Sequence, residues 1–124
     1  MRAPEPLTGI RMVAAPAALD ALAWPDGVAA LRFAADDLFV LGATTAEVPA
    51  ALVEDERGFV GWWLSIEELH DHLLEHIDWP LPATRPALAQ GLIAGVPAKL
   101  WLTPDRVLLF TAAAYAHELM ERLP

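Results

Sequence analysis

Cysteine is absent from the 124 residues of this chain. Its absence excludes disulfide bonds, thiolate nucleophiles and zinc sites built from thiolates. Asparagine is absent too, and serine occurs only once, at position 65. A serine nucleophile would have to be Ser65, and the residues around it assign Ser65 to the start of a helix instead.

Positive charge is scarce. One lysine, Lys99, and seven arginines stand against 17 acidic residues, which gives a formal net charge of −9. Phosphate backbones and anionic lipid surfaces select lysine and arginine. We therefore expect neither a nucleic acid nor a membrane among the partners of this protein.

Long apolar runs are also missing. Proline or charge interrupts every apolar stretch well short of the about 18 residues that a membrane span needs. The N-terminus has no apolar stretch behind a basic start, as a signal peptide would. We expect a cytoplasmic protein, and the 56% hydrophobic content is ample for a packed core.

The order of elements follows from turn signals and periodicity. Residues 1–26 are rich in proline and predict an arm, with one short helix over 14–22. Strands are predicted over 28–34, 38–41, 58–64, 96–102 and 106–111, and helices over 65–77, 85–93 and 112–123. The acidic run 54–56 is interpreted as a solvated loop.

Short connections between successive strands favour antiparallel pairing. The predicted fold class is α+β, with the order βββ-α-(α)-ββ-α and the helices packed on one face of a mainly antiparallel sheet. We expect one domain over residues 1–124, with the proline-rich arm 1–26 packed on it or leading into it.

The helix over 65–77 has the clearest signature. Ser65 and Glu68 fit a capping box, in which each side chain accepts a hydrogen bond from the other residue's main-chain amide. Ile66, Leu69, Leu73 and Ile77 recur at helical spacing and predict the buried stripe. Glu67 and Asp71 lie away from that stripe, so they are predicted on an acidic exposed face.

Histidines on this helix raise the question of a metal site. His72 and His76 are four residues apart, a spacing that lets two imidazoles share one ion, and His70 falls on the apolar side. His117 and Glu121 of the last helix would complete a site if the two helices lie side by side. The alternative is a solvated surface on which Glu68 pairs with His72. No cofactor and no catalytic residue is predicted.

Five tryptophans are many for this length. Indole rings are enriched at the centres of interfaces. Adjacent Trp62 and Trp63 point to opposite faces of a strand, so one enters the core. The other needs cover from another element, a partner chain or a ligand.

Residues 81–123 carry a resemblance. The segments 89–91, 96–102 and 114–116 are similar to the end of the gamma subunit of heterotetrameric sarcosine oxidases. The chain departs from that family in its shorter length and in lacking the central Asp-x-Ser strand. The resemblance implies a small non-catalytic subunit of an amine-oxidising flavoenzyme complex.

The sequence therefore favours a small, non-catalytic interaction protein that docks to a larger protein partner or forms a homo-oligomer. Its predicted interface consists of Trp62, Trp63, Glu67 and Asp71, with the acidic residues steering a basic partner. The first alternative is a metal-binding module or metal-dependent enzyme that uses His72, His76, His117 and Glu121. The second is a domain that binds a small molecule in a pocket lined by tryptophans.

Overall fold

The computed structural model describes all residues from 1 to 124 and divides them into two compact units. The larger unit contains residues 1–6 and 58–124, and the smaller unit contains residues 7–57. Every strand pair in both units is antiparallel. None of the helices has the length and apolar character needed to span a bilayer.

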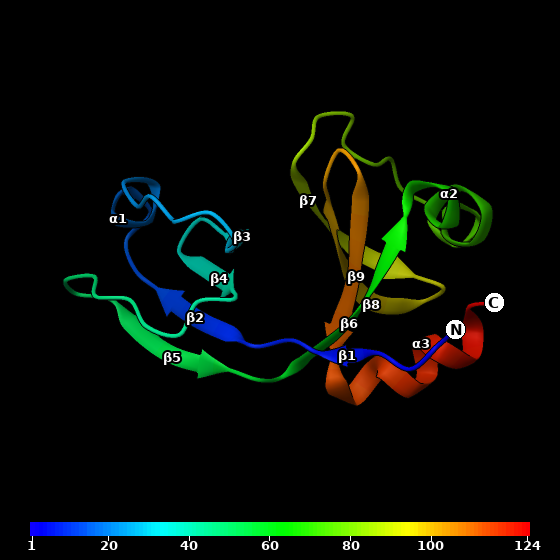
Figure 1. Cartoon of the computed structure of the whole chain (residues 1–124), viewed down its shortest axis with the longest axis horizontal. Helices are drawn as coiled ribbons and strands as arrows, with labels where there is room; N and C mark the ends of the chain where they lie inside the picture. Colours follow the sequence, from blue (N-terminus) through cyan, green and yellow to red (C-terminus); the bar gives the residue numbers. More distant parts are fainter. The chain divides into compact units, whose positions relative to one another are not determined.

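The larger unit is built on a five-stranded sheet in the order β1-β6-β9-β8-β7 (Figure 1). Its strands are β1 (Glu5–Pro6), β6 (Phe59–Ser65), β7 (Ala87–Ile93), β8 (Val96–Leu102) and β9 (Arg106–Ala112). Residues 103–105 form the turn between β8 and β9, where the Arg106 amide donates a hydrogen bond to Thr103 Oγ1 at 3.1 Å.

Two helical segments cover one face of this sheet (Figure 1). The first consists of α2 (Ile66–Glu68), the π-helical η1 (Leu69–Leu73) and the 3₁₀-helical η2 (Leu74–His76). The second consists of the 3₁₀-helical η3 (Ala113–Tyr115) and α3 (Ala116–Arg122). Leu69, Leu73 and Leu119 from these segments share one buried core with Trp62 and Leu64 of β6.

The smaller unit has a four-stranded sheet in the order β3-β4-β2-β5. Its elements are β2 (Gly9–Val13), α1 (Pro16–Asp20), β3 (Ala29–Ala34), β4 (Asp37–Leu41) and β5 (Leu52–Glu56). Leu19 of α1 packs in one core with Ile10, Met12, Leu38 and Val40 of the sheet. Arg11 donates to Asp37 at 2.5 and 2.7 Å and to Glu56 at 2.8 Å, so one guanidinium joins β2, β4 and β5.

The predicted fold class is confirmed: the chain is α+β, its sheets are antiparallel, and the helices of the larger unit pack on one sheet face. The five predicted strands are all present, as β3, β4, β6, β8 and β9. The single domain over residues 1–124 stays a prediction.

The helix predicted over 85–93 is wrong, because residues 87–93 form the strand β7. Residues 94 and 95, which follow this strand, form a turn. Ala94 and Gly95 have φ values of +50° and +79°, which suits the two-residue turn of a β-hairpin between β7 and β8. The alanine and glutamine of this segment favour a helix locally, and pairing with β8 overrides that preference.

The acidic run was also misassigned. Residues 54–56 belong to β5, the edge strand of the smaller sheet, rather than to a loop. Charged residues are common on edge strands, where they oppose pairing with other chains. The predicted arm is likewise more structured than expected, since residues 1–26 contain β1, β2 and α1.

The helix over 65–77 is helical through residue 76 as predicted, and its geometry is irregular. The Leu74 amide bonds to the Leu69 carbonyl, five residues back, which widens the middle turn into a π-helix. A 3₁₀ turn follows and ends at Ile77. His72 and His76 therefore do not occupy successive turns of one regular α-helix.

Candidate functional site

The two adjacent tryptophans of β6 point to opposite faces of the sheet, as alternation requires. Trp62 is 1% exposed and belongs to the core of the larger unit. Its indole N–H donates a hydrogen bond to the Arg2 carbonyl at 2.8 Å. Because this side chain is fully used inside the unit, Trp62 presents no surface to a partner.

Trp63 is half-buried and receives cover from its own chain. The guanidinium of Arg106 lies over its ring, with Cζ 3.7 Å from the ring centroid, in a cation–π contact. The Trp63 carbonyl accepts a hydrogen bond from Arg2. Trp63 is therefore the tryptophan that lies outside the core, and Arg106 of β9 covers part of its ring.

The capping box is formed as predicted. The Glu68 amide donates to Ser65 Oγ at 3.0 Å, and the Ser65 amide donates to Glu68 Oε1 at 3.1 Å. Hydrogen bonding from the Ser65 amide, together with the nearby Arg2, holds the pKa of Glu68 below its usual value. The cap fixes where the helix begins and hence where its exposed side chains point.

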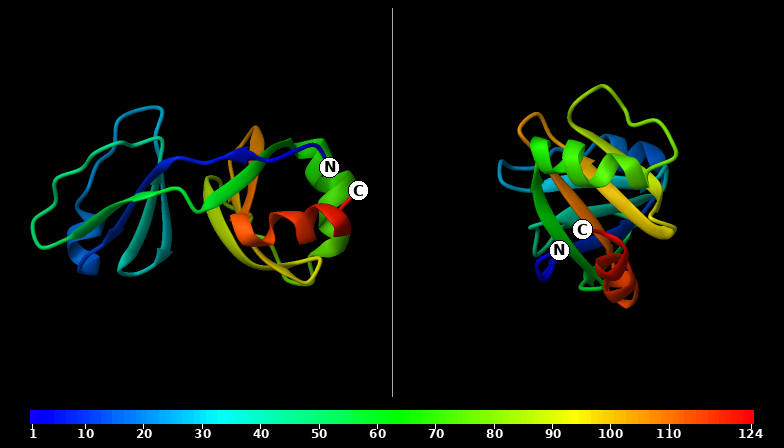
Figure 2. Two further views of the ribbon diagram at one scale, coloured as in Figure 1. Left: turned by 90° about the horizontal axis from the view of Figure 1, so that it is seen from below. Right: turned by 90° about the vertical axis from the view of Figure 1, so that its right-hand side faces the viewer.

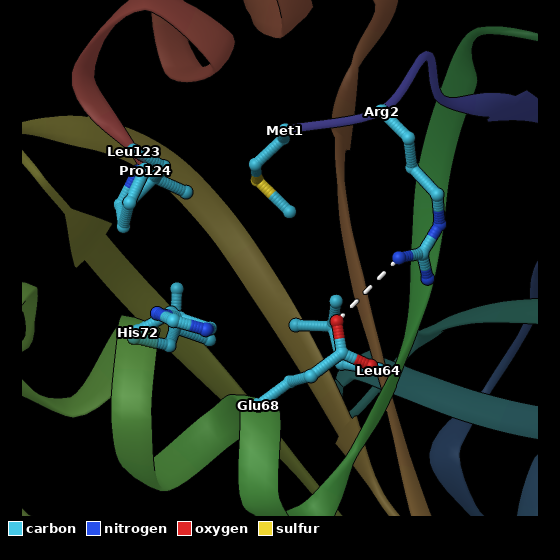
Figure 3. A pocket seen from close by; sticks show the side chains of 8 residues that line it. Met1, Arg2, Leu64, Glu68, His72, Leu123 and Pro124 are labelled. Carbon is cyan, nitrogen blue, oxygen red and sulfur yellow. Dashed lines mark hydrogen bonds and ion pairs between the residues drawn. The ribbon is translucent and has the colours of Figure 1, made fainter.

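A cavity of about 200 Å³ lies beside this cap (Figure 3). Met1 and Pro124, whose ends of the chain lie close together in Figure 2, contribute to its lining. Glu68 and His72 reach it from the helix, and Arg2 approaches Glu68 with Nη1 3.5 Å from Oε2. The predicted alternative pair between Glu68 and His72 is not formed, because Arg2 and Ser65 are the partners of Glu68.

The four histidines do not converge. No group of three histidine, aspartate or glutamate side chains lies close enough together to hold a metal ion. His76 pairs with Glu75 at 3.4 Å, and His117 pairs with Glu121 at 3.0 Å on the exposed side of α3. The metal site of His72, His76, His117 and Glu121 stays a prediction, and no geometry in the chain favours it.

An open, mostly apolar groove of about 360 Å³ lies along the same helix. One wall is the helical segment, which contributes Ile66, Leu69, His70 and Leu74, together with Ile77 directly after it. The other wall is the connection to β7, which contributes Trp79, Leu81, Pro82, Ala83 and Arg85. We call it the Trp79 groove; His70 lines it beside the apolar residues, as the helical spacing predicts.

Trp79 is held in place by β7. Its indole N–H donates to the Leu92 carbonyl at 2.9 Å. The ring lies against Gly91 so closely that a Cβ at that position would be 2.6 Å from Trp79 Cε2. Glycine is therefore required at position 91 for the indole to lie flat on the strand, and this contact gives the groove a fixed wall.

Three exposed acidic residues stand next in sequence to residues that line the groove and are called the acidic rim: Glu67, Asp71 and Asp78. Glu67 follows Ile66 and Asp71 follows His70, while Asp78 stands between Ile77 and Trp79. None of the three forms an ion pair within 4.0 Å. The rim therefore presents negative charge that no side chain of this chain neutralises.

The interface predicted from sequence stays a prediction, although Trp62 is too deeply buried to belong to it. Glu67 and Asp71 are exposed as expected, and each follows in sequence a residue that lines the apolar surface of the groove. That surface belongs to Trp79 rather than to Trp62. Sequence reasoning missed Trp79 because its place depends on a contact with Gly91, 12 residues further along the chain.

Comparison with known proteins adds no relative: no family model, no curated protein and no solved structure matches this chain. The similarity of residues 81–123 to the sarcosine oxidase gamma subunit accordingly stays an expectation. The function has to be argued from the groove and its charges.

Proposed function

We propose that this chain is an interaction protein that docks a segment of a partner protein in the Trp79 groove. The observation that carries the proposal is an open apolar groove with a tryptophan fixed in its wall. Apolar concavities rimmed by polar residues are typical of protein interaction sites. Tryptophan is among the residues that contribute most binding free energy at interfaces.

Both walls are ordered before a partner arrives. The capping box fixes the start of the helical wall. The hydrogen bond from Trp79 to β7 fixes the opposite wall, and Pro80 and Pro82 restrict the backbone that follows. A groove that is already ordered loses little conformational entropy on binding, so more of the contact free energy contributes to affinity.

Selection from a library of random peptides of about 15 residues, enough for four helical turns, tests this proposal. We expect the protein to enrich a consensus peptide whose affinity can be measured by fluorescence anisotropy. Ala83→Lys places a long charged side chain at an exposed position of the groove and should weaken binding at least about tenfold, the loss that a strong interface residue gives.

Leu52→Lys is the matched control. Leu52 is 70% exposed and belongs to the smaller unit, so the same lysine there should leave affinity unchanged. Circular dichroism confirms that both variants fold. An absence of enriched peptides, or equal affinity of the wild type and Ala83→Lys, would refute docking in the groove.

A further inference from the structure

The acidic rim indicates which kind of partner the Trp79 groove takes. We infer, on the basis of the proposed function, that the partner segment is a basic amphipathic helix, with its apolar face in the groove and its lysines or arginines facing Glu67 and Asp71. The groove would bind the apolar face of the partner helix, and the carboxylates of the acidic rim would attract its basic residues.

Charge complementarity is the first argument. The rim carboxylates are exposed and have no cationic partner in this chain. Arg85, the arginine that lines the groove, donates hydrogen bonds to the carbonyls of Pro82 and Thr84 and forms no ion pair within 4.0 Å. Positive residues on a partner would meet unneutralised negative charge, which speeds association and disfavours acidic competitors.

The local main chain supplies the second argument, because it disfavours a partner that adds a strand. At the end of β7 nearest the groove, the Leu92 carbonyl already accepts from Trp79. The Ala94 amide already donates to the His76 carbonyl at 2.9 Å. An incoming segment cannot pair with these two main-chain groups at this end of the edge strand β7, whereas a helix needs no such pairing because it satisfies its own amides and carbonyls.

A second copy of the chain is a poor occupant for the same electrostatic reason. Each copy carries a formal net charge of −9, because 17 acidic residues stand against one lysine and seven arginines. Like charges at an interface oppose association. A basic partner of different sequence therefore fits the groove better than self-association does.

The experiment uses the library-selected consensus peptide as its probe, together with versions in which every basic residue is replaced by glutamine. We expect the selected peptides to carry net positive charge and to gain helical circular dichroism on binding. The double variant Glu67→Gln/Asp71→Gln should bind the basic peptide about three- to tenfold more weakly at about 0.05 M salt, as expected for two exposed pairs. This difference should vanish near 0.5 M salt.

The double variant Glu47→Gln/Glu54→Gln is the matched control, since both residues are exposed in the smaller unit and the change in net charge is the same. It should bind within about twofold of the wild type. Equal effects in the two double variants, or enrichment of neutral or acidic peptides, would overturn the inference. If Ala83→Lys still weakens binding at least about tenfold in that case, docking stands and only the partner chemistry fails. If Ala83→Lys leaves the affinity unchanged, docking fails as well.

Discussion

Adding one methyl group at Gly91 is the sharpest structural test of how the groove is built. Glycine within a strand is ordinarily less stable than alanine by about 0.5–1 kcal/mol, so Gly91→Ala would by itself stabilise β7. The structure predicts the opposite sign. A Cβ at this position would lie 2.6 Å from Cε2 and 2.7 Å from Nε1 of Trp79.

The magnitude follows from those distances. Carbon atoms in contact are separated by about 3.5–4.0 Å, so the indole has to move outward by about 1 Å. That movement weakens the 2.9 Å hydrogen bond from Trp79 to the Leu92 carbonyl, whose net value is about 0.5–1.5 kcal/mol. Overpacking adds about 1–3 kcal/mol. After the propensity gain is subtracted, Gly91→Ala should lower the free energy of unfolding by about 0.5–4 kcal/mol.

Urea denaturation followed by tryptophan fluorescence measures this change, since four of the five tryptophans belong to the larger unit. The midpoint should fall while the m-value stays constant. In a Trp79→Leu background, Gly91→Ala should become neutral or stabilising, because the indole that the methyl group meets is gone. A stabilising effect of Gly91→Ala in the wild-type background would refute the proposed packing of Trp79 on β7.

Four further predictions concern the helix cap and the two sheets. Ser65→Ala should lower the free energy of unfolding by about 0.5–2 kcal/mol in urea denaturation, because the helix loses its cap. Glu68 has a lowered pKa in the folded state, so its carboxylate contributes stability above its ordinary pKa of about 4.5 and loses this contribution as the pH falls through its pKa in the folded state. Glu68→Gln should therefore weaken the pH dependence of the free energy of unfolding in this acidic range. Thr111→Val should cost about 1–3 kcal/mol by calorimetry, since the buried hydroxyl donates at 2.7 Å to a carbonyl of β8. Arg11→Met should destabilise the smaller unit by about 1–3 kcal/mol in hydrogen exchange, because it leaves the carboxylate of Asp37 unpaired on a partly buried sheet face.

The features that could be predicted from the sequence depend on residues close together in the chain. The capping box of Ser65 and Glu68 depends on residues three apart, and it formed as predicted. The turn over 103–105 also depends on neighbours, and it joins two strands where expected. Alternation along β6 correctly placed Trp62 and Trp63 on opposite faces.

The errors came from contacts between residues distant in the sequence. Residues 87–93 have a helical preference, and only the partner strand β8 shows that they are extended. Alternation could not say which tryptophan of β6 is buried, because that depends on the core shared with the helices. The Trp79 groove was missed for the same reason, since its wall exists only when β7 runs beneath Trp79 at Gly91.

The central claim is that a partner segment lies between the helix of residues 66–76 and the connection over 77–85. Titration of the nitrogen-15-labelled protein with the library-selected peptide, followed by two-dimensional amide NMR spectra, tests it most directly. We predict that the largest shifts fall on residues 66–85 and on the Trp79 indole N–H, and that they disappear in Ala83→Lys. Shifts concentrated elsewhere, or unchanged by Ala83→Lys, would contradict docking in the Trp79 groove.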